Sequence, residues 1–170
     1  VIRKSPRDVF SANAGFDQQI KKNDSTNVNA DDILEPAIYN WYDPEGNLIY
    51  SGRNATVSPE ITTTYKLEVM ASTDGFKDYD EVVIEVQQFW LKDITPNPTA
   101  STTNISYQIE GASSAYLMVL NGFGTVNNNY IITPNSNQVI LDVSGYTPGV
   151  YNVILIVDGQ AVDAKSLVVQ

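Results

Sequence analysis

Two clusters of carboxylates are the residues whose types and spacing could do chemistry. Residues 78–81 read Asp-Tyr-Asp-Glu, and residues 31–32 are both Asp. Calcium takes six to eight oxygen ligands, so Asp78, Asp80 and Glu81 are weak candidate metal ligands. They lack the spacing and the Gly of an EF-hand loop, and a solvated acidic loop is the simpler interpretation. Paired carboxylates could also serve a glycosidase as acid and base, but a small two-sheet module rarely offers the cleft that this needs.

Composition narrows the remaining chemistry. The chain has no Cys and no His, which excludes thiol nucleophiles, His-based triads and zinc or copper sites built on these residues. Twenty acidic and ten basic residues give a formal charge of −10. This charge repels phosphate and anionic lipid, so we expect no nucleic-acid partner. No apolar stretch approaches the roughly 20 residues of a membrane helix, so we expect no membrane insertion, and nothing calls for a cofactor.

The elements that must position any site are strands. Apolar residues alternate with polar ones within residues 65–70, 82–86 and 103–110, and helical periodicity is nearly absent. Turn signals separate such runs at short intervals, for example Asp-Pro-Glu-Gly at 43–46 and Asp-Gly at 158–159. Many short antiparallel strands without long helices predict an all-β fold of the sandwich or barrel type.

A proline-rich segment divides the chain into halves. Pro96 and Pro98 cannot lie in a central strand, and about seven strands are expected on each side of them. Each half suits one immunoglobulin-sized sandwich, whereas a single sandwich of all the strands is the alternative. We therefore expect two consecutive immunoglobulin-like antiparallel β-sandwich domains, at residues 1–88 and 94–170, with a linker at 89–93.

The first half carries a Trp before a turn. Trp41 precedes Pro-Glu-Gly, and the run SPEITTTYKLEV leads into a long strand and then an alternating one. Over about residues 10–88 this order resembles a PKD-like or immunoglobulin-like module of bacterial surface proteins. A buried Trp usually anchors such a core. The alternative is an exposed platform for carbohydrate, to which Tyr39 and Tyr50 could contribute.

The second half contains an ordered series of turns and strands. The series comprises Pro96-Asn97-Pro98, an alternating strand, Asn-Gly-Phe before Gly124, then Pro148-Gly149-Val150-Tyr151, Asp158-Gly159 and a final strand with Lys165. This order resembles the type A C-terminal sorting domain of cargo proteins of the type IX secretion system of Bacteroidetes. The first residue, Val rather than Met, suggests that the chain is a processed product or a fragment.

The residue types near the end of the chain also predict its turns and strands. Thr147-Pro148-Gly149 favours a type II turn, and Asp158-Gly159 favours a type I′ hairpin. The strand between them, residues 150–157, is apolar on both faces, so it is either central and covered or has an adhesive outer surface. A receptor could read the paired terminal strand as a rigid shape or by adding a strand to it.

The resemblance implies a function without catalysis. It implies an address label on a secreted or surface-attached protein, recognised by an outer-membrane translocon and removed by a sortase, with the first domain as a spacer. Any enzyme activity would belong to an upstream part of the parent protein. The implied signal residues are Pro96, Asn97, Pro98, Gly124, Pro148, Gly149, Tyr151, Gly159 and Lys165.

Two departures from the family and one alternative remain. The family often ends in Lys or Arg, whereas this chain ends in Gln170, and Thr125 replaces a frequently basic residue. The alternative function is a glycan- or protein-binding adhesin module of a bacterial surface protein. A cluster of exposed aromatic side chains on one face would favour that alternative.

Overall fold

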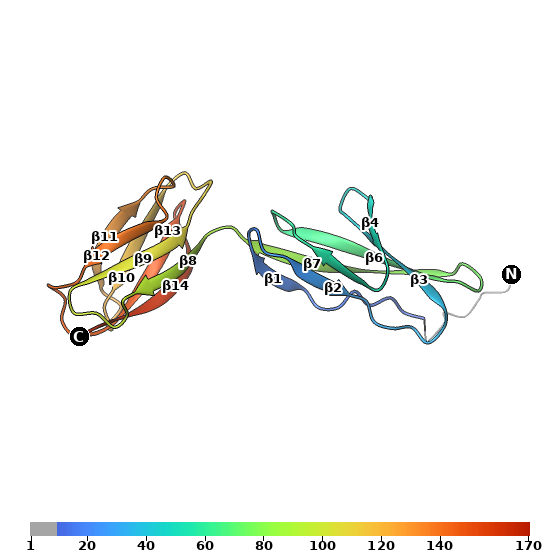
Figure 1. Cartoon of the computed structure of the whole chain (residues 1–170), viewed down its shortest axis with the longest axis horizontal. Helices are drawn as coiled ribbons and strands as arrows, with labels where there is room; N and C mark the ends of the chain where they lie inside the picture. Colours follow the sequence, from blue (N-terminus) through green and yellow to red (C-terminus); the bar gives the residue numbers. More distant parts are fainter. Residues whose placement is uncertain (1–9) are drawn as a thin grey trace. The chain divides into compact units, whose positions relative to one another are not determined.

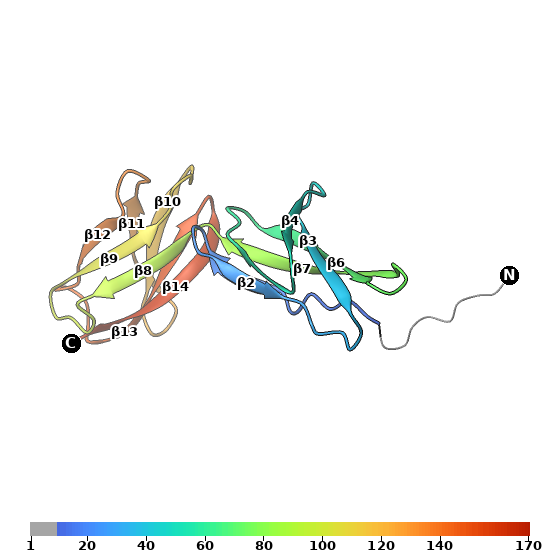
Figure 2. The ribbon, with the colours of Figure 1, turned by 45° about the vertical axis from the view of Figure 1, so that its right-hand side comes forward.

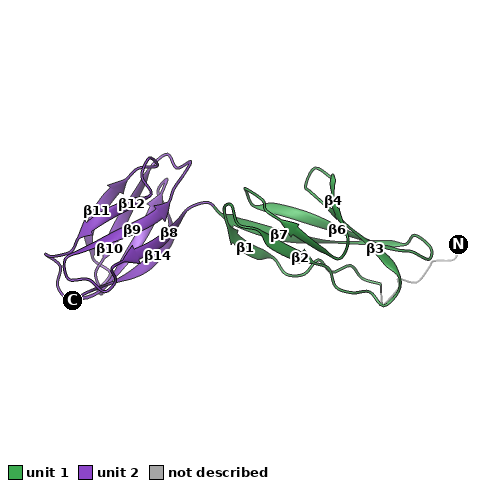
Figure 3. Ribbon diagram, in the orientation of Figure 1, with its two compact units in different colours: residues 1–87 green, residues 88–170 purple. Residues whose placement is uncertain are grey.

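The computed structural model describes residues 10–170, which form fourteen strands and contain no helix (Figure 1). The chain divides after Gln87 into two compact units, called unit 1 and unit 2 below (Figure 3). Each unit holds seven of these strands, packed as mainly antiparallel sheets around its own core. The predicted all-β class with two consecutive sandwiches is confirmed.

Unit 1 contains the first seven strands. They are β1 (Gln18–Lys21), β2 (Thr26–Asn29), β3 (Ala37–Tyr42), β4 (Leu48–Ser51), β5 (Asn54–Val57), β6 (Thr63–Ala71) and β7 (Lys77–Gln87). One sheet has the order β1-β7-β6-β3-β4, and β2 pairs with β5 in the other. β1 runs parallel to β7, and the remaining pairs are antiparallel.

The core of unit 1 lies between these sheets. The predicted alternation holds in β6, where Leu67 and Val69 are fully buried, and in β7, where Val82 and Ile84 are. Trp41 of β3 is opposite Leu67 and has no exposed surface. A buried Trp on the third strand is a hallmark of immunoglobulin-like sandwiches, so the anchor interpretation of Trp41 is confirmed.

Unit 2 contains the last seven strands. They are β8 (Trp90–Thr95), β9 (Thr102–Gln108), β10 (Ala115–Leu120), β11 (Val126–Ile132), β12 (Gln138–Asp142), β13 (Gly149–Val157) and β14 (Gln160–Val169). One sheet has the order β11-β10-β13-β14 and the other the order β12-β9-β8. Figure 2 shows β8 beside β14, the neighbouring edge strands of the two sheets. The first, second and fifth strands thus face the others, as in immunoglobulin-like folds.

The core of unit 2 explains why β13 is so apolar. β13 pairs with β10 on one side and with β14 on the other, so it is a central strand. Its residues Tyr151, Val153 and Leu155 point into the core and are at most 3% exposed. They meet the alternating face of β9, where Ile105 and Tyr107 are buried as expected.

The segment expected as a linker is largely strand. The sequence predicted a linker at residues 89–93, but β8 begins at Trp90 and pairs with β9. Leu91 is 1% exposed, and its backbone N–H donates to Asp163 Oδ2 at 2.8 Å. Burial of Leu91 therefore draws this segment into unit 2, which a motif centred on prolines does not indicate.

Candidate functional site

The turn between β10 and β11 is closed by the side chain of Asn121. Its Oδ1 accepts hydrogen bonds from the backbone N–H groups of Phe123 and Thr125, both at 3.0 Å. Gly124 has a φ of 77°, a left-handed conformation that glycine adopts without strain. The side-chain oxygen of Asn121 closes this turn as the oxygen of an Asp would.

Tyr151 ties the start of β13 to the preceding loop. Its Oη donates to the backbone carbonyl of Thr147 at 2.9 Å, and the ring is buried. A Tyr in this strand that bonds to backbone a few residues upstream is the tyrosine corner of immunoglobulin-like sandwiches. The tyrosine of the Pro-Gly-Val-Tyr motif therefore holds the loop that enters β13 in place.

Two further tyrosines form a cluster with Tyr151. The ring centroids of Tyr146 and Tyr151 lie 5.0 Å apart. The hydroxyls of Tyr130 and Tyr146 are hydrogen-bonded at 2.9 Å. Burial and this hydrogen bond raise the pKa of Tyr130 to about 12. The cluster links β11, the 143–148 loop and β13.

The turn before β13 differs from the expected one. The sequence predicted a type II turn at Thr147-Pro148-Gly149, but Gly149 has a φ of 159°, close to extended, and begins β13. The chain reverses earlier, where Tyr146 N–H donates to the Val143 carbonyl at 2.9 Å. Asp142 favours this earlier turn because its Oδ1 accepts from both the N–H and the hydroxyl of Ser144.

The hairpin between β13 and β14 has the expected geometry. Asp158 and Gly159 have φ angles of 49° and 82°, the two positive values that a type I′ turn requires. Asp158 Oδ1 also accepts hydrogen bonds from the N–H groups of Ser113 and Ser114, at 3.0 and 2.7 Å. Asp158 thus joins this hairpin to the loop between β9 and β10, a role that the Asp-Gly pair alone does not reveal.

Asn97 fastens the edge of the terminal strand. Its Nδ2 donates to the Ser166 carbonyl at 2.8 Å, and its Oδ1 accepts from the Val168 N–H at 2.8 Å. The side-chain amide thus binds the backbone of β14 as a neighbouring strand would. The Thr95–Pro96 and Asn97–Pro98 peptide bonds are both cis.

Thr99 continues this edge. Its N–H donates to the Val168 carbonyl at 3.0 Å, and its carbonyl accepts from Gln170 N–H at 2.9 Å. It forms a parallel bridge with Val169. The outer edge of β14 is therefore occupied from Ser166 onward by the segment that contains the Pro-Asn-Pro motif.

The neighbouring charged residues of β14 face toward the other sheet. Lys165 lies opposite Val153 and Asp163 opposite Leu155, both core positions of β13. Asp163 is the residue that accepts the Leu91 N–H, and sequence reasoning missed it. An inward-pointing charge on an edge strand discourages pairing with another chain.

The motifs gather at one end of the four-stranded sheet. Register places the end of β10 opposite Asn152 and Gly149 opposite Val169. Residues 121–123 and 147–151 line one small hollow of about 160 Å³. The Pro-Asn-Pro segment binds β14 at the same end, whereas Gly159 lies in the turn at the opposite end of β13.

The candidate metal ligands of unit 1 do not converge. Asp78 Oδ2 accepts from the Ala12 N–H at 2.8 Å, and Asp80 Oδ2 accepts from the Ala14 N–H at 2.7 Å. Glu81 lies on the opposite face of β7, paired with a residue of β6 whose side chain also faces outward. Among residues 10–170, no group of three or more carboxylates has an arrangement that could hold a metal ion.

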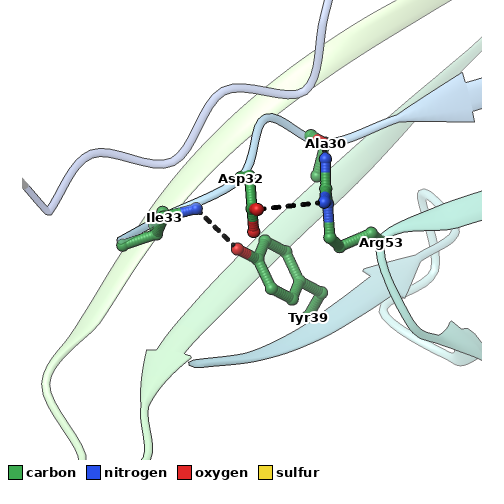
Figure 4. Close-up of polar contacts among 5 residues, drawn as sticks. All are labelled: Ala30, Asp32, Ile33, Tyr39 and Arg53. Carbon is green, nitrogen blue, oxygen red and sulfur yellow. Dashed lines mark hydrogen bonds and ion pairs between the residues drawn. The ribbon is translucent and has the colours of Figure 1, made fainter. Parts of the chain in front are cut away.

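The second acidic pair is engaged in local contacts. Asp32 forms an ion pair of 3.3 Å with Arg53, as Figure 4 shows. Asp31 accepts a hydrogen bond from Asn13 at 2.7 Å. In the same figure the Ile33 N–H donates to the hydroxyl of Tyr39 at 3.0 Å. These contacts hold the loop between β2 and β3.

The alternative interpretation of Trp41, a carbohydrate platform, does not hold. Trp41 is fully buried and its Nε1 donates to the Gly52 carbonyl at 3.1 Å. Tyr39 is 7% exposed on the core side of β3, and only Tyr50 of the three is open, at 47%. The alternation of β3 turns Tyr39 and Trp41 toward the core, which explains why the anchor interpretation holds and the alternative does not.

Comparisons with solved structures find other chains of β-sandwich domains. A two-domain fibronectin type III segment of chicken tenascin is 12% identical, with 88% of this chain and 93% of that chain covered and a TM-score of 0.44. Domains 3 and 4 of rat CD4 are 8% identical, with 91% and 100% covered and a TM-score of 0.41.

The BSP domain of a biofilm-associated protein is 10% identical, with 94% of this chain covered and a TM-score of 0.37. This chain spans 29% of that protein. The comparison with curated proteins gave no match. In the part of the chain that the structure describes, no helix has the length and apolar character needed to cross a bilayer.

A family model matches the second unit. Residues 93–170 match the secretion system C-terminal sorting domain. A domain of this family marks its protein for export through the type IX secretion system to the cell surface or the medium. Residues 93–170 therefore belong to the secretion system C-terminal sorting domain family, and an immunoglobulin-like module precedes them.

Proposed function

We propose that unit 2 is recognised as a folded label by the outer-membrane translocon of the type IX system and is then removed by a surface sortase. Unit 1 is the spacer that separates this label from the upstream part of the parent protein, where any catalytic activity would lie. The partners are therefore secretion proteins, and the label itself needs no cofactor.

One observation carries this proposal. The signal residues implied by the resemblance all belong to one sandwich, and four of them have contacts or backbone angles that shape the β11-β10-β13-β14 sheet. Gly124 and Gly159 shape its hairpins, Tyr151 fastens the entry to β13, and Asn97 closes the edge of β14. These residues serve the shape of the sheet, which supports recognition of a folded surface over recognition of an unfolded tail.

The proposal is tested by following the label through export. The full chain is placed behind a signal peptide and a reporter in a host with a type IX system, with an affinity tag at its C-terminus. During export the tag should retrieve the translocon, and mass spectrometry of the surface product should find residues 88–170 missing. A surface product that keeps the tag would contradict removal by a sortase, and absence of the translocon from the retrieved material would contradict its recognition.

A second candidate function is saccharide binding by unit 1. A hollow of about 580 Å³ lies on the outer face of its larger sheet, and Tyr42, Tyr79, Glu68 and Glu81 line part of it. Tyr79 is 47% exposed, and Lys66 Nζ lies 4.4 Å from the centre of its ring. Aromatic rings beside a few polar groups are typical of small-ligand sites.

A glycan array tests this second candidate. Under it, the chain binds a defined glycan set, Tyr79→Ala abolishes binding, and Leu48→Ala, at an exposed position outside the hollow, leaves it intact. Absence of binding by the unsubstituted chain, or binding that survives Tyr79→Ala, would rule this hollow out.

A further inference from the structure

The outer face of the β11-β10-β13-β14 sheet is unusually apolar. It is formed by the side chains that alternate with the core positions of β10, β13 and β14, and we call its six large apolar and solvent-accessible members the apolar face: Tyr116, Met118, Leu120, Val150, Ile154 and Val168. The same side also carries Ile156, which is 6% exposed, and the uncharged polar residues Asn129, Asn152 and Ser166. Met118 lies opposite Ile154, and Val150 lies opposite Val168. Val150 is 54% exposed and the other five are partly buried. An antiparallel sheet usually turns a polar face to water, so this face departs from the rule.

The apolar face also lacks charge. Within residues 88–170, all of which are described, the acidic and basic side chains lie elsewhere. On β14 the two charged residues, Asp163 and Lys165, point to the core side, and the outward positions are Ala164 and Ser166. In a chain of net charge −10, an uncharged face of this extent is a specific feature.

The other sheet of the same unit provides the contrast. Its outer face carries Asn104, Ser106 and Gln108 on β9, and Gln138 on β12, together with the apolar Ile140, which is 70% exposed, and Trp90. Asn104 Nδ2 donates to Gln138 Oε1 at 2.8 Å across this face. One sheet thus has a mostly polar exterior and the other a mostly apolar one, although both cover the same core.

The outer edge of β14 is less suited to binding a partner than the apolar face. Asn97 and Thr99 occupy the outer edge of β14 from Ser166 onward. Strand addition at that edge would have to displace these hydrogen bonds. The face, in contrast, leaves Val150 54% exposed.

We infer that the secretion machinery binds unit 2 at the apolar face. The machinery would make this contact through an apolar and uncharged protein surface of its own. This inference rests on the proposed function and names the contact that it requires. The cores of protein interfaces are depleted of charge, and burying this face costs no desolvation of an ionised group. A lipid surface is less suited, because no Lys or Arg projects from this face toward anionic headgroups.

The test places charges on the face without disturbing the core. The full chain, behind a signal peptide and a reporter, carries Val150→Glu or Ile154→Lys in a host with a type IX system. The matched controls are Ser106→Glu and Gln108→Lys on the polar face of the other sheet. Val150→Glu is the safest variant for folding because its side chain is the most exposed. Melting of each purified variant is measured in parallel.

The face variants should lower export by about tenfold or more, as expected for a residue at the centre of an interface. The controls should export like the parent, and all should melt near the parent temperature. Normal export of a folded Val150→Glu chain would overturn the inference while leaving the sorting function intact. Failure of the unsubstituted chain to be exported would instead contradict the proposed function.

Two binding measurements test whether a second copy of the chain or a lipid surface occupies the face instead. Sedimentation of the purified chain should show a monomer, and vesicles of outer-membrane lipid should not bind it. A dimer that Val150→Glu dissociates would assign the face to a second copy of the chain. Vesicle binding that Val150→Glu abolishes would assign it to lipid, and either result would overturn the inference.

Discussion

Asn97 and Val168, 71 residues apart in the sequence, are joined by a hydrogen bond of 2.8 Å from the Val168 N–H to Asn97 Oδ1. The same side chain donates to the Ser166 carbonyl. Asn97→Ala removes both bonds and should destabilise unit 2 by about 1–2 kcal/mol, since each exposed bond contributes modestly. Chemical denaturation measures this loss, and hydrogen exchange at Val168 should become faster.

A matched variant separates the two bonds. Asn97→Asp keeps the oxygen that accepts from Val168 and loses the donor to Ser166, so its stability should lie between those of the parent and Asn97→Ala. Unchanged exchange at Val168 in Asn97→Ala would show that the edge of β14 is held by other contacts.

Tyr151→Phe tests the tyrosine corner. The change removes one hydroxyl and leaves the Thr147 carbonyl without its 2.9 Å partner, so we expect a loss of about 1–2 kcal/mol. Tyr116→Phe, on the outer face of β10, is the control and should stay within about 0.5 kcal/mol of the parent. Equal stability of the two variants would contradict the conclusion that the Tyr151 hydroxyl holds the loop before β13.

Trp41→Ala should destabilise unit 1 by about 3–5 kcal/mol, because it leaves a large cavity between the sheets. Fluorescence of Trp90 then reports unit 2 alone, and its unfolding transition should not change. A Trp41→Ala chain with normal unit 1 stability would show that the indole is not the anchor of that core.

The stability of unit 1 should depend on pH through Glu68. Burial opposes ionisation of this carboxyl, but hydrogen bonds from Lys77, Tyr79 and Asn40 outweigh it and hold the pKa below the usual 4.5. Lys77 Nζ lies 2.9 Å from Glu68 Oε2. A lowered pKa stabilises the folded state above pH 4.5, and this stabilisation is lost as the pH falls through the folded value.

The measurement is unfolding of the parent and Glu68→Gln from pH 3 to pH 7. The parent should lose more stability on acidification than the variant, and the two curves should approach each other at the acid end. Parallel curves over the whole range would show that Glu68 does not contribute to the pH dependence.

The boundary between the units predicts a protease-sensitive site. β7 ends at Gln87 and β8 begins at Trp90, so limited proteolysis should cut within residues 87–90 and release two protected fragments. Preferential cutting inside residues 100–165 would contradict the division into two units.

Periodicity was sufficient to predict most strands. Tyr65, Leu67 and Val69 alternate as a half-buried strand must, and the structure buries that face. β11 was harder, because Asn127 to Asn129 have low strand propensity and it is held by pairing with β10. Each residue of β4 is exposed and the strand carries no core pattern, but the Asp-Pro-Glu-Gly turn before it predicts the second strand of a hairpin.

The hydrogen bonds that the motif residues form join residues that are far apart in the sequence. The Pro-Asn-Pro motif was visible in the sequence, but the bonds from Asn97 to Ser166 and Val168 depend on the fold. Asp163 likewise looked like an ordinary surface charge, although it accepts the Leu91 N–H 72 residues away. The Asp158-Gly159 hairpin was predictable because its two residues determine it locally.

The central claim is that residues 88–170 are sufficient to direct export. The direct measurement is the fraction of a reporter found on the cell surface or in the medium of a host with a type IX system. A signal peptide and reporter followed by residues 88–170 should be exported, whereas the same protein lacking Ala161 to Gln170 should stay in the periplasm. Equal export of the reporter with and without residues 88–170 would contradict the sorting role.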